Sequence, residues 1–88
     1  MLTKFSIVII SLHCTMKITQ GKFKRELGNR IIALRTQLGL TQEQLAHRMG
    51  KDKQFINRYE VEGANPTAYI LIQLANALEV SVDELLSI

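Results

Sequence analysis

Helix boundary signals follow one another closely along this chain, and they constrain its fold more than any other feature. Gly39 and Gly50 are stop signals, because glycine readily adopts the positive φ that ends a helix. Thr41-Gln-Glu-Gln44 and Ser81-Val-Asp-Glu84 are start signals, since each is a capping box whose two side chains bind backbone N–H groups at a helix start. No period-two strand pattern appears after residue 16. The sequence therefore predicts an all-α domain of short helices.

Five helices are expected, over residues 22–38, 41–50, 53–60, 66–78 and 81–86. In the first, apolar residues recur at three- and four-residue intervals and fall on one face. Asp52 is the expected N-cap of the third helix, and Pro66 is the expected first residue of the fourth. The residues expected on the buried faces of the first four helices are Phe23, Leu27, Ile31, Leu34, Leu38, Leu45, Ala46, Met49, Ile56, Tyr59, Ala68, Leu71, Leu74, Ala75 and Leu78.

The composition fits one small domain and offers little for catalysis. The chain has 88 residues, 47% of them hydrophobic, which leaves no room for a second core. Cys14 is the only cysteine, which excludes an internal disulfide and a multi-cysteine zinc site and is compatible with the reducing cytoplasm. His13 and His47 are the only histidines, and no nucleophile stands in a recognisable catalytic arrangement. We therefore expect no metal, no cofactor and no enzymatic activity.

The net charge of +3 hides a strong asymmetry along the chain. Residues 1–60 contain all 11 basic residues and four of the eight acidic residues, which gives a net charge of +7. Residues 61–88 contain the other four acidic residues, which gives −4. Such an asymmetry is expected when one half of a protein faces a polyanion, although scattered solvated charges would produce it as well.

Residues 1–15 are predicted to be an N-terminal extension, separate from the domain at 22–86. The apolar run Phe5–Leu12 is about half the length that a membrane span needs, so no membrane anchor is expected. Two interpretations remain open. The run is a β-type strand that pairs with a partner's edge, or translation begins at Met16 and the extension is not native. We favour the second, under which Cys14 has no role.

Residues 41–60 predict two short helices joined by a tight glycine turn, which is the form of a helix-turn-helix. Ala46 is expected where the two helices cross, because a larger side chain would force them apart. In a domain with a basic half, such a pair typically places its second helix in the major groove of DNA. This unit, at about 41–60, is the candidate functional motif.

Five segments give this motif a recognisable pattern: Thr41-Gln-Glu-Gln-Leu-Ala-His-Arg-Met-Gly50, Ile56-x-x-Tyr-Glu60, Asn65-Pro66, Leu74-Ala-Asn-Ala-Leu78 and Val80-Ser-Val-Asp-Glu-Leu85. From about Leu27 to Leu86 the chain closely resembles the Cro/C1-type (XRE-like) helix-turn-helix family. The resemblance implies a five-helix lambda-repressor-like fold and transcriptional regulation. It also implies a protein that usually acts as a homodimer on double-stranded DNA, at a palindromic operator.

The exposed face of residues 53–60 supplies the candidate base-reading side chains. Arginine pairs with guanine, glutamine and asparagine pair with adenine, and lysine contacts guanine or phosphate. Asp52 is expected near the groove as the cap and as an acceptor for cytosine. The base-reading set is Asp52, Lys53, Gln54, Asn57 and Arg58, of which the family pattern favours Lys53, Gln54 and Arg58.

The candidate phosphate contacts lie beside this face. Gln42 stands at the exposed start of the second helix, where a side-chain donor and backbone N–H groups can hold a phosphate. Arg48 and Lys51 flank the base-reading face, and Lys24 and Arg30 of the first helix are weaker candidates. The phosphate set is Thr41, Gln42, Arg48 and Lys51.

Several side chains admit a structural role. Glu60 is expected to pair within the domain, with Arg35 as a candidate partner. Phe55 departs from the family pattern, and it contacts a thymine methyl group, supports the core or marks a partner surface. Lys51 also departs from the pattern, since it replaces a frequent apolar residue in the turn.

An apolar excess on the fourth helix points to a partner. Tyr69, Ile70 and Ile72 lie between the core positions and form either a dimer contact or packing against the last helix or the N-terminal segment. The alternative function is a protein-interaction module, such as an antitoxin that binds a toxin, or an adaptor. The residues of the recognition face favour DNA, and a dominant role for Phe55, Tyr69 and Ile70 would favour a protein partner.

Overall fold

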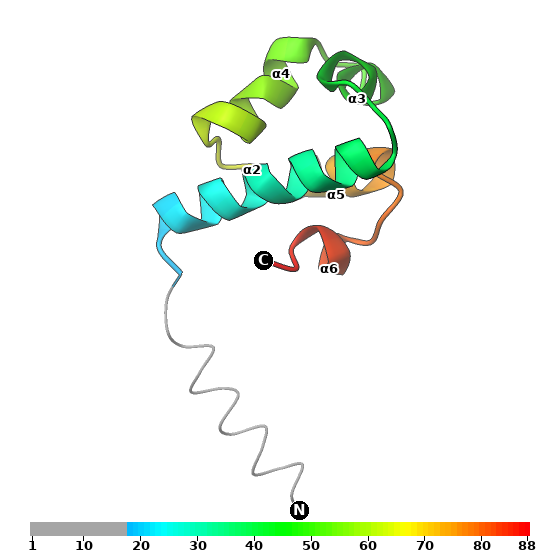
Figure 1. Ribbon diagram of the computed structural model, residues 1–88. Coiled ribbons are helices and arrows are strands. Elements are labelled where there is room, and N and C mark those ends of the chain that lie inside the picture. Colours follow the sequence, from blue (N-terminus) through cyan, green and yellow to red (C-terminus); the bar gives the residue numbers. More distant parts are fainter. Residues whose placement is uncertain (1–17) are drawn as a thin grey trace, which may run out of the picture.

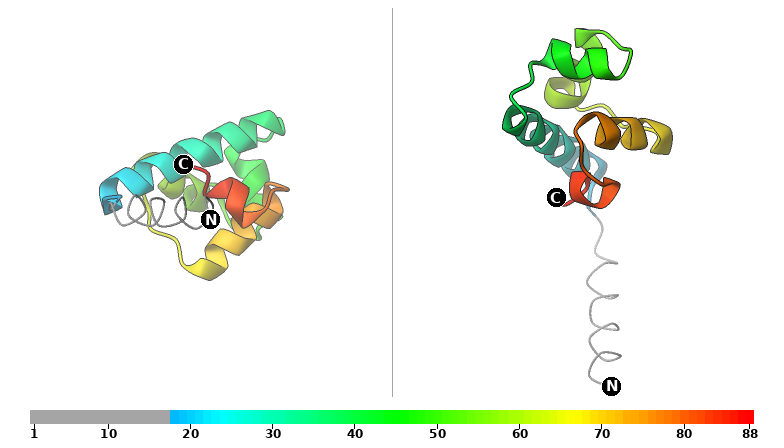
Figure 2. Two further views of the ribbon diagram at one scale, coloured as in Figure 1. Left: turned by 90° about the horizontal axis from the view of Figure 1, so that it is seen from below. Right: turned by 90° about the vertical axis from the view of Figure 1, so that its right-hand side faces the viewer.

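A computed structural model describes residues 18–88 of the chain. These residues form α2 (Gln20–Gln37), α3 (Gln42–Arg48), α4 (Lys53–Asn57), the π-helical turn η1 (Arg58–Glu62), α5 (Ala68–Ala77) and α6 (Val82–Leu85), and no strand occurs among them. Helix α2 runs across the domain, with α3 and α4 on one side of it and α6 on the other (Figures 1 and 2). The prediction of an all-α domain is confirmed. The predicted extension at 1–15 lies outside the described residues.

The helix boundaries follow the signals in the sequence. The Thr41 hydroxyl accepts a hydrogen bond from the Gln44 backbone N–H at 3.0 Å, and the Gln44 side chain accepts one from the Thr41 N–H at 2.9 Å. Ser81 and Glu84 form the second capping box in the same way at the start of α6. Gly39 and Gly50 adopt φ of 72° and 68°, which are values that favour glycine. The stop and start signals are therefore confirmed as local structure.

Two predicted boundaries are wrong. Helix α5 begins at Ala68, not at Pro66, because the Thr67 hydroxyl caps it by accepting from the Ile70 N–H at 3.2 Å. A hydroxyl before the first turn satisfies a backbone donor that proline cannot. The helical segment that begins with α4 continues through η1 to Glu62 and ends at Gly63, whose φ is 75°.

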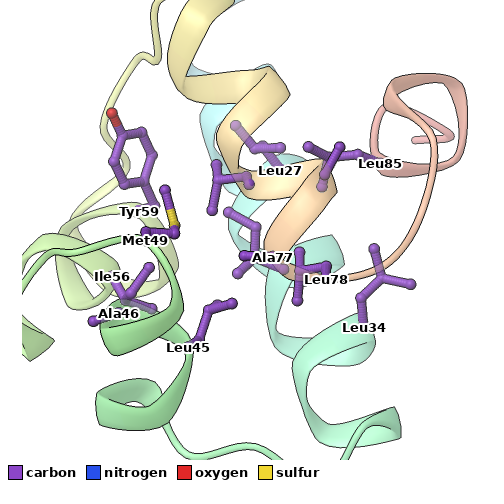
Figure 3. Packing of buried hydrophobic residues seen from close by; sticks show 13 residues of the cluster. Leu27, Leu34, Leu45, Ala46, Met49, Ile56, Tyr59, Ala77, Leu78 and Leu85 are labelled. Atoms are coloured by element: carbon purple, nitrogen blue, oxygen red, sulfur yellow. The ribbon is translucent and has the colours of Figure 1, made fainter.

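The core draws side chains from every helix of the described part (Figure 3). Its members are Leu27, Ile31, Leu34, Leu45, Ala46, Met49, Ile56, Tyr59, Leu74, Ala75, Ala77, Leu78 and Leu85. Most of the predicted core is confirmed, with two exceptions. Ala68 is exposed because α5 starts there with its first turn in solvent, and Leu38 is 38% exposed because it lies at the end of α2.

One close approach positions the recognition segment, which is the turn at Lys51 and Asp52 followed by α4 and η1. Gly28 is buried in α2, and a Cβ added there would lie 2.6 Å from the Tyr59 carbonyl oxygen and 3.1 Å from that of Glu60. The first distance is too short for a carbon atom, and the second is unusually tight. The backbone of η1 therefore rests directly on α2, and only glycine allows this contact. None of the helices in residues 18–88 is long and apolar enough to span a membrane.

Candidate nucleic-acid interface

The helix-turn-helix is built from α3, α4 and the turn between them. Gly50 donates its N–H to the His47 carbonyl at 3.1 Å, and Lys51 donates to the Ala46 carbonyl at 2.9 Å. Ala46 and Ile56 have no exposed surface. The predicted small residue therefore lies in the core, where α3 packs against α4. This packing fixes the direction in which the outer face of α4 points.

The outer face of α4 presents polar side chains to solvent. Lys53, Gln54 and Arg58 are exposed, and Asn57 is half-buried. Within residues 18–88, none of these four side chains makes a hydrogen bond or an ion pair. Ile56 and Tyr59 are buried on the other side of the same segment. The arrangement separates a polar outer face from an apolar inner one, as the sequence predicted.

Asp52 caps α4, because its Oδ1 accepts a hydrogen bond from the Phe55 N–H at 3.0 Å. The capping role predicted for it is confirmed, and the contact with cytosine stays a prediction. The side chain is exposed, so Oδ2 can still accept.

Behind the polar face, a buried network joins α2, α3 and η1. Arg35 Nε donates to Glu60 Oε2 at 2.7 Å, and Arg35 Nη2 donates to Glu60 Oε1 at 3.1 Å. Arg35 Nη1 also donates to the Leu40 carbonyl at 2.7 Å. The Glu60 side chain is only 2% exposed. The predicted pairing of Arg35 with Glu60 is confirmed, and its two-point geometry is the strong form of this contact.

Gln42 belongs to this network as well as to the candidate interface. Its Nε2 donates to Glu60 Oε1 at 2.9 Å, so the carboxylate holds the side chain in place. An amide nitrogen carries two hydrogens, and one remains for a phosphate oxygen. A hollow of about 530 Å³ opens here, lined by Arg35, Gly39, Leu40, Thr41, Gln42, Glu43 and Lys53. The structure thus brings Lys53, a predicted base reader, together with Thr41 and Gln42 from the predicted phosphate set.

Two other basic residues have partners inside the domain. Arg48 Nη1 donates to the Ala77 carbonyl and to Glu79 Oε2, both at 2.9 Å, and so ties α3 to the end of α5. Its phosphate contact remains a prediction, alongside this structural role. Arg30 Nε donates to the Glu84 carbonyl at 2.9 Å. Its side chain therefore lies beside α6, which Figure 1 shows across α2 from α3 and α4.

Phe55 lies under the outer face rather than on it. It is half-buried and packs against the core, with its ring centroid 5.2 Å from that of Tyr59. Lys51 Nζ lies over the same ring at 5.2 Å from the centroid, and Arg58 Cζ lies at 5.8 Å. Of the roles considered for Phe55, support of the core is therefore present in the structure.

Two apolar side chains of α5 remain in solvent. Tyr69 is 67% exposed and Ile72 is 50% exposed, whereas Ile70 is half-buried and packs against the core. The Gln73 amide donates weakly to the Tyr69 hydroxyl at 3.4 Å. Of the three candidate dimer contacts, Tyr69 and Ile72 thus form the exposed pair.

Titration and metal binding add little to this surface. Burial raises the pKa of the Tyr59 phenol, and the neighbouring Arg58 guanidinium lowers it in part. No group of three or more histidine, cysteine or acidic side chains that could hold a metal ion occurs in residues 18–88.

Comparison with known proteins identifies the fold. The HTH_3 helix-turn-helix family matches residues 31–85, which include α3, α4 and the whole buried network. The chain belongs to this family. Its sequence is 38% identical over 64 residues to the uncharacterized HTH-type transcriptional regulator y4dJ of Sinorhizobium fredii, covering 73% of this chain and 83% of that protein.

Solved structures agree. The restriction-modification controller protein C.AhdI of Aeromonas hydrophila matches with a TM-score of 0.66 and 34% identity, over 70% of this chain and 90% of that one. An HTH_3 family transcriptional regulator of Vibrio cholerae matches with a TM-score of 0.71 and 28% identity, over 76% of this chain and 38% of that one. The predicted Cro/C1-type resemblance is confirmed, and the protein is a helix-turn-helix transcriptional regulator, not an enzyme.

Proposed function

We propose that this protein is a sequence-specific DNA-binding repressor that binds a palindromic operator as a homodimer, with α4 in the major groove. The observation that carries the proposal is the outer face of α4. Its amide and cationic side chains make no hydrogen bond or ion pair within residues 18–88, and the packing of α3 on α4 holds them in one direction. Polar side chains that the domain does not use are those that a nucleic acid can use.

The contacts divide between bases and phosphates. Gln54 and Arg58 suit adenine and guanine edges, and Asn57 and Asp52 supply further groups. Lys53 can reach either, because it lines the hollow that contains Thr41 and Gln42. Lys51 lies at the turn, and Arg48 lies further back with its guanidinium partly engaged. We assign the phosphate contacts to Thr41, Gln42, Lys51 and Arg48.

The exposed pair on α5 supports the homodimer. Tyr69 and Ile72 stand close along one helix, and a two-fold axis would place this exposed pair against the same pair of a second copy. Two copies would then present their recognition helices to half-sites about one turn of DNA apart. If the partner were instead a toxin or an adaptor target, the same pair would serve that protein.

Selection of bound duplexes from a random pool, with the full chain, tests the proposal directly. We expect one palindromic motif to be enriched, and the affinity for it to fall steeply as salt rises, because phosphate contacts release counterions. Failure to enrich any motif, or an affinity that does not depend on salt concentration, would contradict the proposal of DNA binding. An enriched motif without a palindrome would remove the homodimer and leave the readout by α4 in place.

Sedimentation of the full chain with Tyr69→Ser and Ile72→Ser tests the dimer contact. We expect the double variant to sediment as a monomer at concentrations where the wild type is a dimer. An unchanged dimer would assign the association to another surface.

A further inference from the structure

Two cations of the recognition segment share one aromatic ring. Lys51 Nζ lies 5.2 Å from the centroid of the Phe55 ring, and Arg58 Cζ lies 5.8 Å from it. Lys51 belongs to the turn before α4, and Arg58 is the first residue of η1. A single side chain therefore contacts a cation at each end of α4.

The ring is itself held in place. Phe55 is half-buried, packs against the core and meets the Tyr59 ring at an interplanar angle of 54°. Tyr59 is in turn 8% exposed, within the core cluster. Tilted aromatic pairs of this kind are favourable, because the positive edge of one ring meets the negative face of the other. Phe55 is thus a fixed platform, whereas the two cations are long side chains that would otherwise sample many rotamers.

The Phe55 ring offsets the electrostatic repulsion between the Lys51 and Arg58 side chains. Two like charges near each other repel, and both are attracted to the electron-rich face of an aromatic ring. An arginine over a ring keeps its N–H donors, which lie in the plane of the guanidinium, available for a base or a phosphate. A lysine over a ring likewise keeps donors for a phosphate oxygen.

We propose that Phe55 is a positioning residue, which holds the Lys51 ammonium and the Arg58 guanidinium in place at the DNA-binding surface before DNA arrives. The inference rests on the proposed function and deepens it. Phe55 acts through the two cations, not through a contact of its own with a thymine methyl group. Ordering the two cations in advance removes part of the entropy cost of binding.

The first test needs no DNA. Protons above an aromatic ring resonate upfield, so the side-chain methylene protons of Lys51 and Arg58 in the wild-type chain should be shifted upfield in NMR spectra. Phe55→Leu should remove the shift, and Phe55→Tyr should retain it because the ring remains. An absence of the shift in the wild type would overturn the proposal, whatever the variants do.

The second test is a cycle of variants that measures affinity for the selected duplex. Phe55→Leu should weaken binding by about two- to tenfold, the range expected when DNA binding must order about one long side chain that the ring no longer holds. In a chain that already carries Lys51→Gln and Arg58→Gln, Phe55→Leu should cause no further loss. An equal loss in both backgrounds would show that Phe55 contacts DNA itself or acts through packing, and would overturn the proposal.

Control measurements separate this inference from the proposed function and from misfolding. Thermal unfolding of each variant identifies the temperatures at which it is fully folded, and binding is measured at one of these temperatures. Phe55→Tyr is expected to bind as the wild type does. Failure of the wild type to bind any duplex would overturn the proposed function. Tight binding by the wild type that Phe55→Leu fully retains would overturn the positioning role alone.

Discussion

Arg58 and Glu60 lie two residues apart in η1, yet their side chains differ in burial and in hydrogen bonding. Glu60 is buried and satisfied, with Arg35 and Gln42 donating to its two oxygens. Arg58 is exposed, and its guanidinium lies over the Phe55 ring. One turn of helix thus has an inner side that uses its polar groups and an outer side that leaves them available. The inner side fixes the position of the outer side.

The comparison teaches that stability and recognition are separable in this domain. Removing a buried partner leaves a charge without compensation, which is costly in any medium of low polarity. Removing an exposed, unpaired polar side chain changes stability little. Substitutions on the two sides of η1 should therefore affect different measurements: the free energy of unfolding for the inner side, and DNA selectivity for the outer side.

Among substitutions on the inner side of η1, Glu60→Ala is expected to lower the free energy of unfolding most. It leaves the Arg35 guanidinium, whose side chain is 14% exposed, without its carboxylate partner. We expect the free energy of unfolding to fall by about 3 to 5 kcal/mol, the usual loss when one member of a buried pair is removed. Urea unfolding measures this. Glu62→Ala, at an exposed position in the same turn, is the matched control and should change stability by less than about 0.5 kcal/mol. Equal losses in the two variants would contradict a special role for Glu60.

Gly28→Ala disturbs the same inner side of η1, because it adds a side chain on α2 where the η1 backbone packs. Its Cβ would lie 2.6 Å from the Tyr59 carbonyl oxygen, which belongs to the backbone and cannot rotate away. We expect a loss of about 3 kcal/mol in the free energy of unfolding, the upper part of the range for overpacking. Gly21→Ala in the same helix is the control, because its Cβ would meet nothing within 4 Å. That variant should be as stable as the wild type or slightly more stable, and a comparable loss there would refute the clash as the cause.

Gly28 also shows where reasoning from the sequence ends. The spacing of apolar residues predicts the helices and most of the core, because a helix must turn one face inward. The same argument finds the capping boxes, since both partners lie within four residues of each other. A contact between α2 and the backbone of η1 leaves no such local mark. No nearby residue in the sequence indicates that a glycine inside a helix is needed for a close contact. Only the packed structure identifies the backbone that it contacts.

The candidate site divides in the same way. The residue types and their spacing predict which side chains face outward from α4. The family position of Glu60 predicts that its carboxylate pairs within the domain, but the sequence names Arg35 only as a candidate partner. The competing partners of Arg48 and Gln42 were not predicted. Arg48 meets Ala77 and Glu79, which are far away in sequence, and the Gln42 amide reaches Glu60 only once α3 and η1 are packed. Long-range polar contacts depend on tertiary geometry that periodicity does not contain.

Arg58→Ala tests the outer side. We expect a loss of about 1 to 3 kcal/mol on the cognate duplex, together with relaxed preference at one base pair. The free energy of unfolding should change little, since the side chain is exposed. Affinities for the selected duplex and for single-base variants of it provide the measurement. Equal weakening on every sequence would demote Arg58 to a phosphate contact, and a large loss of stability would erase the distinction between the two sides of η1.

The smallest expected effect is a dependence of stability on alkaline pH that comes from Tyr59. Burial raises the pKa of its phenol in the folded state, with the Arg58 guanidinium opposing part of the shift. A group whose folded pKa is raised contributes stability below its unfolded pKa of 10.0 and loses it as pH rises through the folded pKa. The effect is modest because the hydroxyl points away from the other labelled core side chains (Figure 3).

Tyr59→Phe isolates this effect from the titration of the lysines, which both proteins share. The difference in the free energy of unfolding between wild type and variant should be constant from neutral pH to about pH 9 and should then shift against the wild type as pH rises further. Urea unfolding at a series of pH values measures this difference. Tyr69→Phe, on the exposed face of α5, is the matched control, and its difference from the wild type should show no such shift. If the difference for Tyr59→Phe also stayed constant through the alkaline range, Tyr59 would bind its proton equally in both states, and its phenol would belong to the solvent-facing side of η1.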